Sequence, residues 1–193
     1  LLAACIAAIG SLCRTPNWDD VEPGIDNVKN TIAVMNTKGG VGKSTVVLGL
    51  AETFSVFEGK SVLVIDSDSQ ASISSMLMST SNLYQLQSSG NTIVEYLVAT
   101  VLNNGTEDWQ KYIVSDLSDV DDANSIFAFP SDVQLTLFER EVSRESQHTR
   151  LRTAIGRLLD QLRSSFDIIL VDCPPGLSVL TESWLREADY HIS

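Results

Sequence analysis

The sequence predicts an α/β fold, in which a three-layer, doubly wound and mainly parallel sheet carries helices on both faces. First, short and almost wholly apolar runs, typical of strands buried on both faces, alternate with longer stretches of helical periodicity. Second, the chain has 193 residues, of which 44% are hydrophobic, and this is enough for one domain with a sizeable core. Third, a glycine-rich turn joins the first apolar run to the first helical stretch. These features together favour a layered α/β domain.

The first three elements follow one another directly. Residues 31–35 are a β-rich run and predict a strand. The apolar stretch 45–57 predicts a helix, and Gly59 is a suitable residue to end it. Residues 61–66 contain four consecutive apolar β-formers and predict a second strand buried on both faces. A βαβ unit results.

The middle of the chain continues the alternation. Thr92 and Glu95 form a capping-box pattern that opens an amphipathic helix through Leu102, and Gly105 is expected to end it. Residues 125–129 are the third strand candidate.

Two helices and a strand are expected next. Ser131 and Gln134 form a second possible capping box, for a helix through about Val142. Residues 166–171 predict a fourth, fully apolar strand. Before it, residues 149–162 predict a helix, because apolar side chains recur there at helical spacing: Leu151, Ile155, Leu158, Leu159 and Leu162.

The two ends of the chain differ from this pattern. We expect an N-terminal helix and linker over residues 1–30, and the domain proper over 31–193 with its C-terminal part missing, since the chain lacks an initial methionine and stops directly after a strand-like run at 189–192. The apolar run 1–13 is too short to span a membrane. Its first residues resemble a lipoprotein cleavage box, but no basic segment precedes them, so a packing helix is favoured over a targeting signal.

Composition excludes several classes of function. The net charge of −12, from 13 basic and 25 acidic residues, argues against the chain as a whole being a polyanion-binding surface. Cys5, Cys13 and Cys173 are odd in number and show no C-x-x-C spacing, so neither a disulfide framework nor a zinc site is indicated. A cytoplasmic location fits this cysteine usage best.

The glycine-rich turn is the first motif that carries chemistry, with the sequence Lys38-Gly39-Gly40-Val41-Gly42-Lys43-Ser44-Thr45. Triphosphate binding at a strand–helix turn requires inward backbone N–H groups, glycines that allow close approach, a lysine for the phosphates and a hydroxyl for magnesium. All four are present. The common G-x-x-x-x-G-K-[ST] pattern is broken at its first glycine and gains an extra lysine instead, so an incidental glycine-rich turn is a poor alternative.

Carboxylates follow two of the predicted strands. Asp66 and Asp68 lie in the run Asp66-Ser67-Asp68-Ser69-Gln70, directly after the second strand. Asp172 ends the fourth strand, which is the Walker B arrangement, and Pro174 and Pro175 stiffen the loop that follows. In isolation each could be a solvated strand end. Because ligands bind at the carboxyl ends of parallel strands, the phosphate-type turn makes a magnesium–nucleotide interpretation the better one.

Together these three segments resemble the ParA/Soj/MinD family of deviant-Walker P-loop ATPases, whose pattern is K-G-G-V-G-K-[ST]-T, then D-x-D-P-Q, then a strand ending in D-x-P-P. The resemblance covers about residues 31–192. It implies a P-loop NTPase fold, with ATP and Mg²⁺ as cofactors, and hydrolysis of ATP. It also implies a cytoplasmic ATPase that dimerises on ATP binding and acts as a switch in plasmid or chromosome partitioning or in cargo positioning.

The resemblance also implies roles for individual residues. Lys38 is expected to reach the phosphates of a partner subunit, and Lys43 to be the ordinary P-loop lysine. Asp68 is expected to position the attacking water. Thr45 is expected to contact the α-phosphate. Magnesium is expected to be held by Ser44, Asp66 and Asp172. Backbone amides for the phosphates are expected from Gly39, Gly40, Val41 and Gly42.

Two residues of the loop after the second strand bear on which branch of the family the chain resembles. Ser69 stands where the family usually has proline, which loosens the loop but removes no reacting group. Gln70 is more like ParA/Soj than MinD. A MinD-like membrane-associated ATPase and a catalytically silent scaffold domain are the alternatives.

The expected partners are a second copy of the chain and an activating protein of ParB type. DNA binding is expected only through a region beyond residue 193, and no stable membrane insertion is expected.

Two further features receive plainer interpretations. His148 and His191 lack a carboxylate or cysteine at ligand spacing and are expected to be surface or packing residues. The arginines between residues 140 and 163 are interrupted by glutamates, so a solvated, salt-bridged helical face is favoured over a DNA contact.

Overall fold

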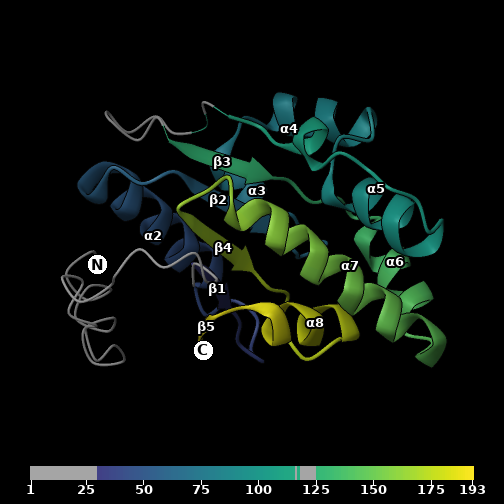
Figure 1. Cartoon of the computed structure of the whole chain (residues 1–193). Helices are drawn as coiled ribbons and strands as arrows, with labels where there is room; N and C mark the ends of the chain where they lie inside the picture. The colour runs from purple at the N-terminus through teal and green to yellow at the C-terminus, as the bar shows by residue number, and fades with distance from the viewer. Residues whose placement is uncertain (1–29, 116, 118–124) are drawn as a thin grey trace.

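The computed structural model describes residues 30–115, 117 and 125–193. Over these residues the chain forms a five-stranded, all-parallel sheet in the order β3-β2-β4-β1-β5 (Figure 1). The predicted strands all occur, within two residues of their expected bounds, and the predicted P-loop type of α/β fold is confirmed. The strands are β1 (Thr31–Val34), β2 (Val62–Asp66), β3 (Ile126–Phe129), β4 (Ile168–Asp172) and β5 (Tyr190–Ile192).

Helices connect the strands and cover both faces of the sheet (Figure 1). The α-helices are α2 (Lys43–Glu58), α3 (Ser72–Leu77), α4 (Thr80–Ser88), α5 (Ile93–Leu97), α6 (Leu135–Val142), α7 (Glu145–Arg163) and α8 (Val179–Glu187). A π-helical turn, η2 (Val98–Leu102), continues α5, and a short 3₁₀ helix, η3 (Trp109–Tyr112), follows. Gly59 ends α2 in the left-handed conformation, as predicted.

Side chains of each strand alternate between two hydrophobic cores. In β2, Leu63 and Ile65 belong to the core formed with α5, α6, α7 and α8, whereas Val62 and Val64 belong to the core formed with α2 and α3. Every residue of β2 is buried, and this explains why its sequence is a continuous apolar run without alternation. The β2 strand therefore holds its last residue, Asp66, in a rigid and dry position.

Helix α7 packs along one face of the sheet. The five apolar residues that predicted it are all fully buried, and each such burial stabilises the fold by roughly 1.5–3 kcal/mol. The helix begins at Glu145, one turn before the expected start at Thr149. The buried residues are Leu151, Ile155, Leu158, Leu159 and Leu162.

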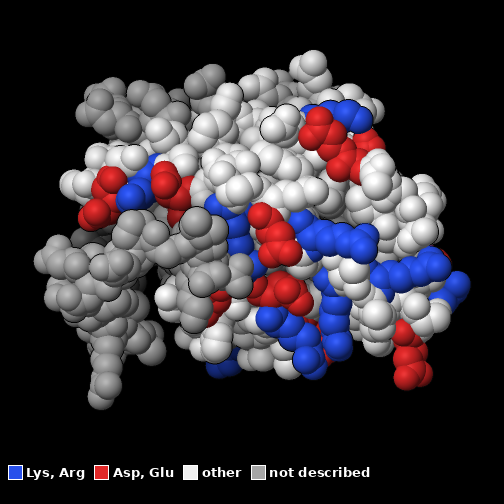
Figure 2. Space-filling model, viewed as in Figure 1, with Lys and Arg blue, Asp and Glu red and all other residues white. Residues whose placement is uncertain are grey.

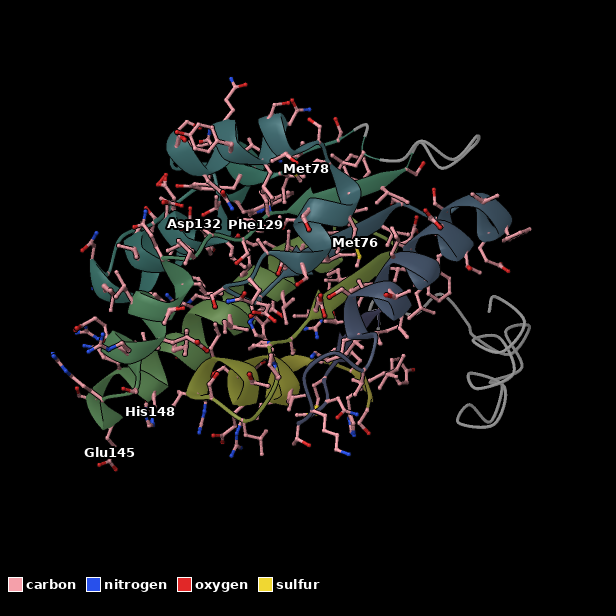
Figure 3. The ribbon with its side chains drawn as sticks, turned by 180° about the vertical axis from the view of Figure 1, so that it is seen from behind. Met76, Met78, Phe129, Asp132, Glu145 and His148 are labelled. Carbon is pink, nitrogen blue, oxygen red and sulfur yellow. The ribbon has the colours of Figure 1, made fainter. Side chains whose placement is uncertain are left out.

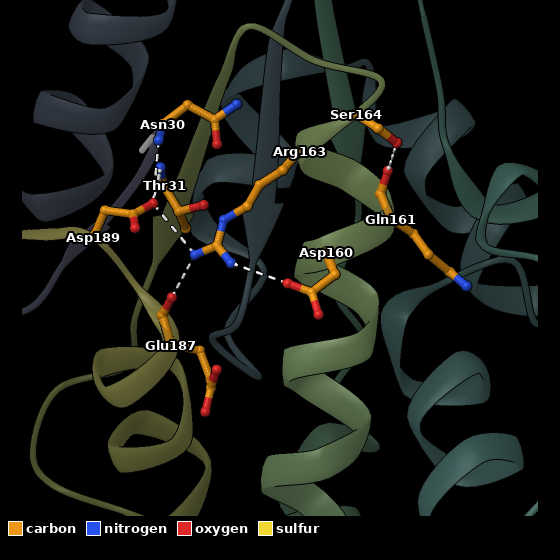
Figure 4. A network of polar contacts seen from close by, with 8 residues as sticks. All are labelled: Asn30, Thr31, Asp160, Gln161, Arg163, Ser164, Glu187 and Asp189. Carbon is orange, nitrogen blue, oxygen red and sulfur yellow. Dashed lines mark hydrogen bonds and ion pairs between the residues drawn. The ribbon is translucent and has the colours of Figure 1, made fainter. Parts of the chain in front are cut away.

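The end of α7 is tied to the starts of β1 and β5 by a polar network (Figure 4). Asp189 Oδ2 accepts hydrogen bonds from the backbone N–H groups of Asn30 (3.1 Å) and Thr31 (3.0 Å) and an ion pair from Arg163 Nη2 (3.2 Å). The same Arg163 nitrogen donates to the carbonyl oxygen of Glu187 at 2.6 Å. Since the sheet is parallel, this network lies at the edge opposite to the carboxyl ends of the strands.

One predicted cap is wrong. The side-chain oxygen of Ser131 is buried without a hydrogen-bond partner among the described residues, and Gln134 caps α6 without a side-chain contact. Asp132 starts the turn instead, since its Oδ1 accepts from the backbone N–H of Gln134 at 2.6 Å. Asp and Ser both favour such turns, and in this structure the aspartate side chain accepts the hydrogen bond.

Three α-helices and the 3₁₀ helix η3 have no counterpart in the sequence prediction. Helix α3 is short and α4 buries only Leu83, so neither shows a clear apolar period. In α8, Leu180 and Trp184 are buried at helical spacing, and the sequence analysis missed this short pattern. The N-terminal helix and linker expected over residues 1–30 lie outside the described residues, apart from Asn30. In the described part of the chain, no helix is both long and apolar enough to cross a membrane.

Candidate functional site

The loop between β1 and α2 turns sharply into the helix. Gly40 (φ 71°) and Gly42 (φ 92°) both take the left-handed conformation, and Gly42 is the N-cap of α2. A Cβ at either position would meet no atom within 4 Å, so the backbone conformation requires glycine here and crowding does not. The first backbone N–H groups of the 16-residue helix α2 therefore face an open site, as anion binding at a helix N-terminus requires.

The strand register brings two carboxylates together beside this loop. Asp66, at the end of β2, pairs with Asp172, at the end of β4, which in turn pairs with Val34 of β1. Each carboxylate residue is only 1% exposed. Ser44, in the first turn of α2, donates from Oγ to Asp172 Oδ2 at 2.6 Å. The sequence predicted all three residues, and the fold places them at one edge of the sheet.

A serine that the sequence analysis missed holds Asp66. Ser74, on α3, donates to Asp66 Oδ2 from its backbone N–H (3.0 Å) and from its hydroxyl (2.6 Å). The Ser74 oxygen also accepts from the backbone N–H of Ser131 at 3.2 Å, after β3. The backbone N–H of Asp68 donates a third hydrogen bond to Asp66, at 3.1 Å from Oδ1. No local pattern distinguishes Ser74 from the other serines of α3, because its partners, Asp66 and Ser131, come from two other segments of the chain.

Burial dominates the electrostatics of the carboxylate pair. It raises the pKa of Asp66 from 3.8 to about 7, opposed by the hydrogen bonds from Ser74 and Asp68 and aided by the charge of Asp172. Burial likewise raises the pKa of Asp172 to about 6, opposed by the Ser44 hydrogen bond and the charge of Lys43, and aided by the charge of Asp68. Burial therefore disfavours the ionised form of both carboxyl groups in the absence of a cation.

The donor set fits a magnesium ion. Asp172 Oδ1 is buried and has no hydrogen-bond partner among the described residues, whereas Oδ2 is held by Ser44. Over residues 30–115, 117 and 125–193 no group of three His, Cys, Asp or Glu side chains could enclose a metal. Magnesium is usually held by one or two carboxylates together with phosphates and water, and a hydroxyl beside two carboxylates suits that arrangement.

The other predicted residues lie around this centre. Asp68 is partly buried, and its Oδ1 accepts from the backbone N–H of Gln70 at 2.9 Å, which folds the loop after β2 into a turn. Lys38 is exposed, and its backbone N–H donates to Asn36 Oδ1 at 3.0 Å. Thr45 is also exposed, while Lys43 is close enough to influence Asp172. The described structure therefore gathers the Ser44, Asp66 and Asp172 side chains and leaves that of Lys38 pointing outward.

The residues given plainer interpretations lie away from this centre, and His191 is exposed in β5. His148 is at the start of α7, well away from Phe129 and Asp132, and its Nε2 contacts the carbonyl oxygen of Ser143 (Figure 3). Basic and acidic side chains are interspersed over α7 and α8 (Figure 2), where Arg152 pairs with Glu182 at 3.5 Å. This mixture fits a salt-bridged helical face.

Comparison with known proteins decides the family. A sequence profile of the AAA domain matches residues 29–193. The chain belongs to that family. The ParA-like domain is 32% identical over 174 residues to the chromosome partitioning protein ParA of Myxococcus xanthus (strain DK1622), covering 87% of this chain and 52% of that protein. It is 30% identical over 159 residues to the sporulation initiation inhibitor protein Soj of Bacillus subtilis (strain 168), covering 82% and 54%.

Solved structures agree with this placement. The ParA-like domain superposes with a TM-score of 0.63 and 27% identity on cobyrinic acid a,c-diamide synthase from Mycobacterium smegmatis, solved with a bound ATP analogue and magnesium. That alignment covers 83% of this chain and 57% of the synthase. The chain spans about half the length of the curated relatives it matches. The resemblance to ParA-like P-loop ATPases is therefore confirmed.

Proposed function

We propose that the site binds ATP with magnesium. The observation that supports this proposal is that three features occur together at one edge of the sheet. They are the left-handed glycine loop, the Ser44–Asp172 hydrogen bond of 2.6 Å, and the strand register that sets Asp66 beside Asp172. Backbone N–H groups of the loop and the Lys43 ammonium bind the phosphates. Ser44, Asp66 and Asp172 hold the magnesium, directly or through its water, and the ion when bound neutralises phosphate charge.

We propose further that the domain hydrolyses ATP, with Asp68 orienting the attacking water. Asp68 lies next to the carboxylate pair, near enough for its charge to raise the pKa of Asp172. Its Oδ1 accepts from Gln70, so the carboxylate is held in place. Catalysis then rests on positioning and charge neutralisation, as is general for phosphoryl transfer.

We also propose that ATP binding drives formation of a homodimer in which Lys38 reaches the partner's phosphates. Lys38 is exposed at the mouth of the site. Large apolar side chains are also exposed at this edge of the sheet, in the loops and first helical turn that follow β1, β3 and β4: Val41 (50%), Val133 (68%), Leu137 (58%) and Leu177 (73%). Such side chains favour burial against a second protein surface.

We propose that this chain serves plasmid or chromosome partitioning or cargo positioning in the cytoplasm. The relative from Myxococcus xanthus, which is named a chromosome partitioning protein, supports this role. An activating partner of ParB type would set the timing of hydrolysis. Basic and acidic residues are mixed on the face shown in Figure 2, so we propose that DNA contact, where it occurs, is not made by this face.

The test of the proposed site compares two lysine variants. Lys43→Ala is expected to weaken Mg-ATP binding by at least tenfold, because the loop offers no second ammonium aimed at the same phosphates. Lys60→Ala is the matched control, since Lys60 is exposed after the far end of α2. Isothermal titration calorimetry measures both. Unchanged affinity in Lys43→Ala would contradict the nucleotide site.

A further inference from the structure

Helix α6 carries a half-buried carboxylate near the site that the proposed function does not use. Glu139 has no ion-pair partner among the described residues. The nearby Glu141 differs, since it is exposed and pairs with Arg144. Burial raises the pKa of Glu139, and the charge of Asp68 raises it further. Ionised Glu139 is therefore unfavourable at this position near Asp68, unless a specific hydrogen bond stabilises it.

That contact is made with the loop that follows Asp172. Ser178 Oγ donates to Glu139 Oε1 at 2.7 Å, across 39 positions of sequence. Ser178 is also the N-cap of α8, since its oxygen accepts from the backbone N–H of Thr181 at 3.1 Å. The hydroxyl therefore joins α6 to the first turn of α8 at one point.

The loop needs such an anchor. Its first end is fixed, because Asp172 is in β4 and the backbone N–H of Cys173 donates to Val34 at 3.0 Å. Between the ends, Gly176 takes a left-handed conformation (φ 91°) in open space, and Leu177 is 73% exposed. In the described part of the chain, the side-chain hydrogen bonds of residues 173–178 are those of Ser178. The anchor at Ser178 thus determines the path of the loop beside the phosphate end of the site.

We propose that Glu139 is a positioning residue for ATP hydrolysis, which acts through Ser178 to hold loop 173–178 against α6 next to Asp68. This inference rests on the proposed ATPase function and adds a residue to its machinery. Glu139 does not touch the nucleotide. It keeps the loop in the arrangement required in the transition state, so its loss lowers the rate of hydrolysis without weakening ground-state binding.

The experiment measures steady-state hydrolysis and Mg-ATP affinity in five variants, one of which is a control. Glu139→Ala is expected to lower kcat at least tenfold, with KM and calorimetric affinity within threefold of wild type. Glu139→Gln keeps an oxygen that accepts from Ser178, so it is expected to restore kcat to within threefold. Ser178→Ala removes the same contact and also the N-cap of α8, so it is expected to lower kcat at least as much as Glu139→Ala, and the double variant is expected to lose no more than Ser178→Ala alone. Glu141→Gln, on the exposed side of α6, is the matched control and is expected to behave as wild type.

Each other outcome has a defined meaning. Additive losses in the double variant, a normal kcat in Glu139→Ala, or a loss confined to ATP affinity would overturn the positioning role while leaving the ATPase intact. Thermal melts identify any variant that fails to fold. If Glu139→Ala is that variant, Ser178→Ala decides the question, because it removes the same hydrogen bond from the other side, and a normal kcat there would overturn the positioning role. A wild-type protein that neither binds nor hydrolyses Mg-ATP would instead overturn the proposed function itself, and this inference with it.

Discussion

The two oxygens of Asp172 differ in their surroundings. Ser44 binds Oδ2, while the buried Oδ1 has no hydrogen-bond partner among the described residues. Without a cation, a carboxylate in this position destabilises the folded state when it is ionised. The residue that suits magnesium binding is therefore unfavourable for the stability of the empty domain, a trade-off common at functional sites.

This leads to a prediction for Asp172→Asn in the absence of nucleotide and magnesium. In the wild-type protein the pKa of Asp172 rises from 3.8 in the unfolded state to about 6 in the folded state. The carboxyl group therefore keeps its proton to higher pH when the protein is folded. The contribution of Asp172 to stability is fully present below about pH 4 and is lost as the pH rises through 6. The variant lacks this loss. We expect its free energy of unfolding to exceed that of wild type by about 1–2 kcal/mol more at pH 8 than at pH 5.

Chemical denaturation at the two pH values measures the difference. Adding Mg²⁺ with a non-hydrolysable ATP analogue at pH 8 serves as the control, since it is expected to stabilise wild type more than the variant. A variant with the same pH dependence as wild type would show that Asp172 does not carry the raised pKa.

Asp68 offers a second test at this scale, because a group that only orients water matters in the transition state. Asp68→Ala is expected to reduce kcat by about 100-fold or more while ATP affinity changes by less than threefold. Single-turnover hydrolysis and calorimetry separate the two effects. Glu145→Ala, at the exposed start of α7, is the control. Loss of ATP binding in Asp68→Ala would assign the water to another residue.

Among the elements, the polar network at the end of α7 joins parts of the fold that are distant in sequence. Arg163 and Asp189 are 18% and 16% exposed, and the pair is reinforced by the backbone of Asn30, Thr31 and Glu187 (Figure 4). Arg163→Ala leaves Asp189 with backbone donors only. We expect a destabilisation of about 1.5–3 kcal/mol, as for hydrogen bonds to charged groups.

Arg144→Ala is the matched control for this prediction, because Arg144 pairs with Glu141 at 3.4 Å and both side chains are more than half exposed. Its expected effect is within about 0.5 kcal/mol. Urea denaturation of the two variants provides the measurement. Equal effects would mean that the network at the end of α7 contributes no more than a surface ion pair.

Elements with a strong local signal could be predicted from sequence, and those fixed by distant contacts could not. The run Val62–Ile65 and the apolar series of α7 gave a strand and a helix because burial sets their periodicity. The predicted cap at Ser131 failed since two adjacent residues could both start the turn. At the site, Ser44, Asp66 and Asp172 follow from motifs, but Ser74 acts through long-range packing that a local pattern does not encode.

The whole molecule combines a negative net charge of −12 with exposed apolar side chains at the edge that holds the site. Two like-charged copies repel each other at long range, and that repulsion opposes dimer formation by the empty protein. Mg-ATP bridged by Lys38 from each side would add attraction where the apolar side chains can also be buried. The balance of these effects predicts a monomer without nucleotide and a dimer with it.

We therefore expect Lys38→Ala and Leu177→Ser each to bind Mg-ATP within threefold of wild-type affinity, yet to weaken ATP-dependent dimerisation at least tenfold. The lysine variant removes the trans contact with phosphate, and the leucine variant removes apolar area from the same edge. Phe57→Ser is the matched control: Phe57 is 70% exposed, but it lies at the far end of α2, so its loss should leave dimerisation unchanged. Multi-angle light scattering with a non-hydrolysable ATP analogue measures the three. If Phe57→Ser alone impaired dimerisation, the interface would lie at the opposite edge of the sheet, and Lys38 would act only within its own subunit.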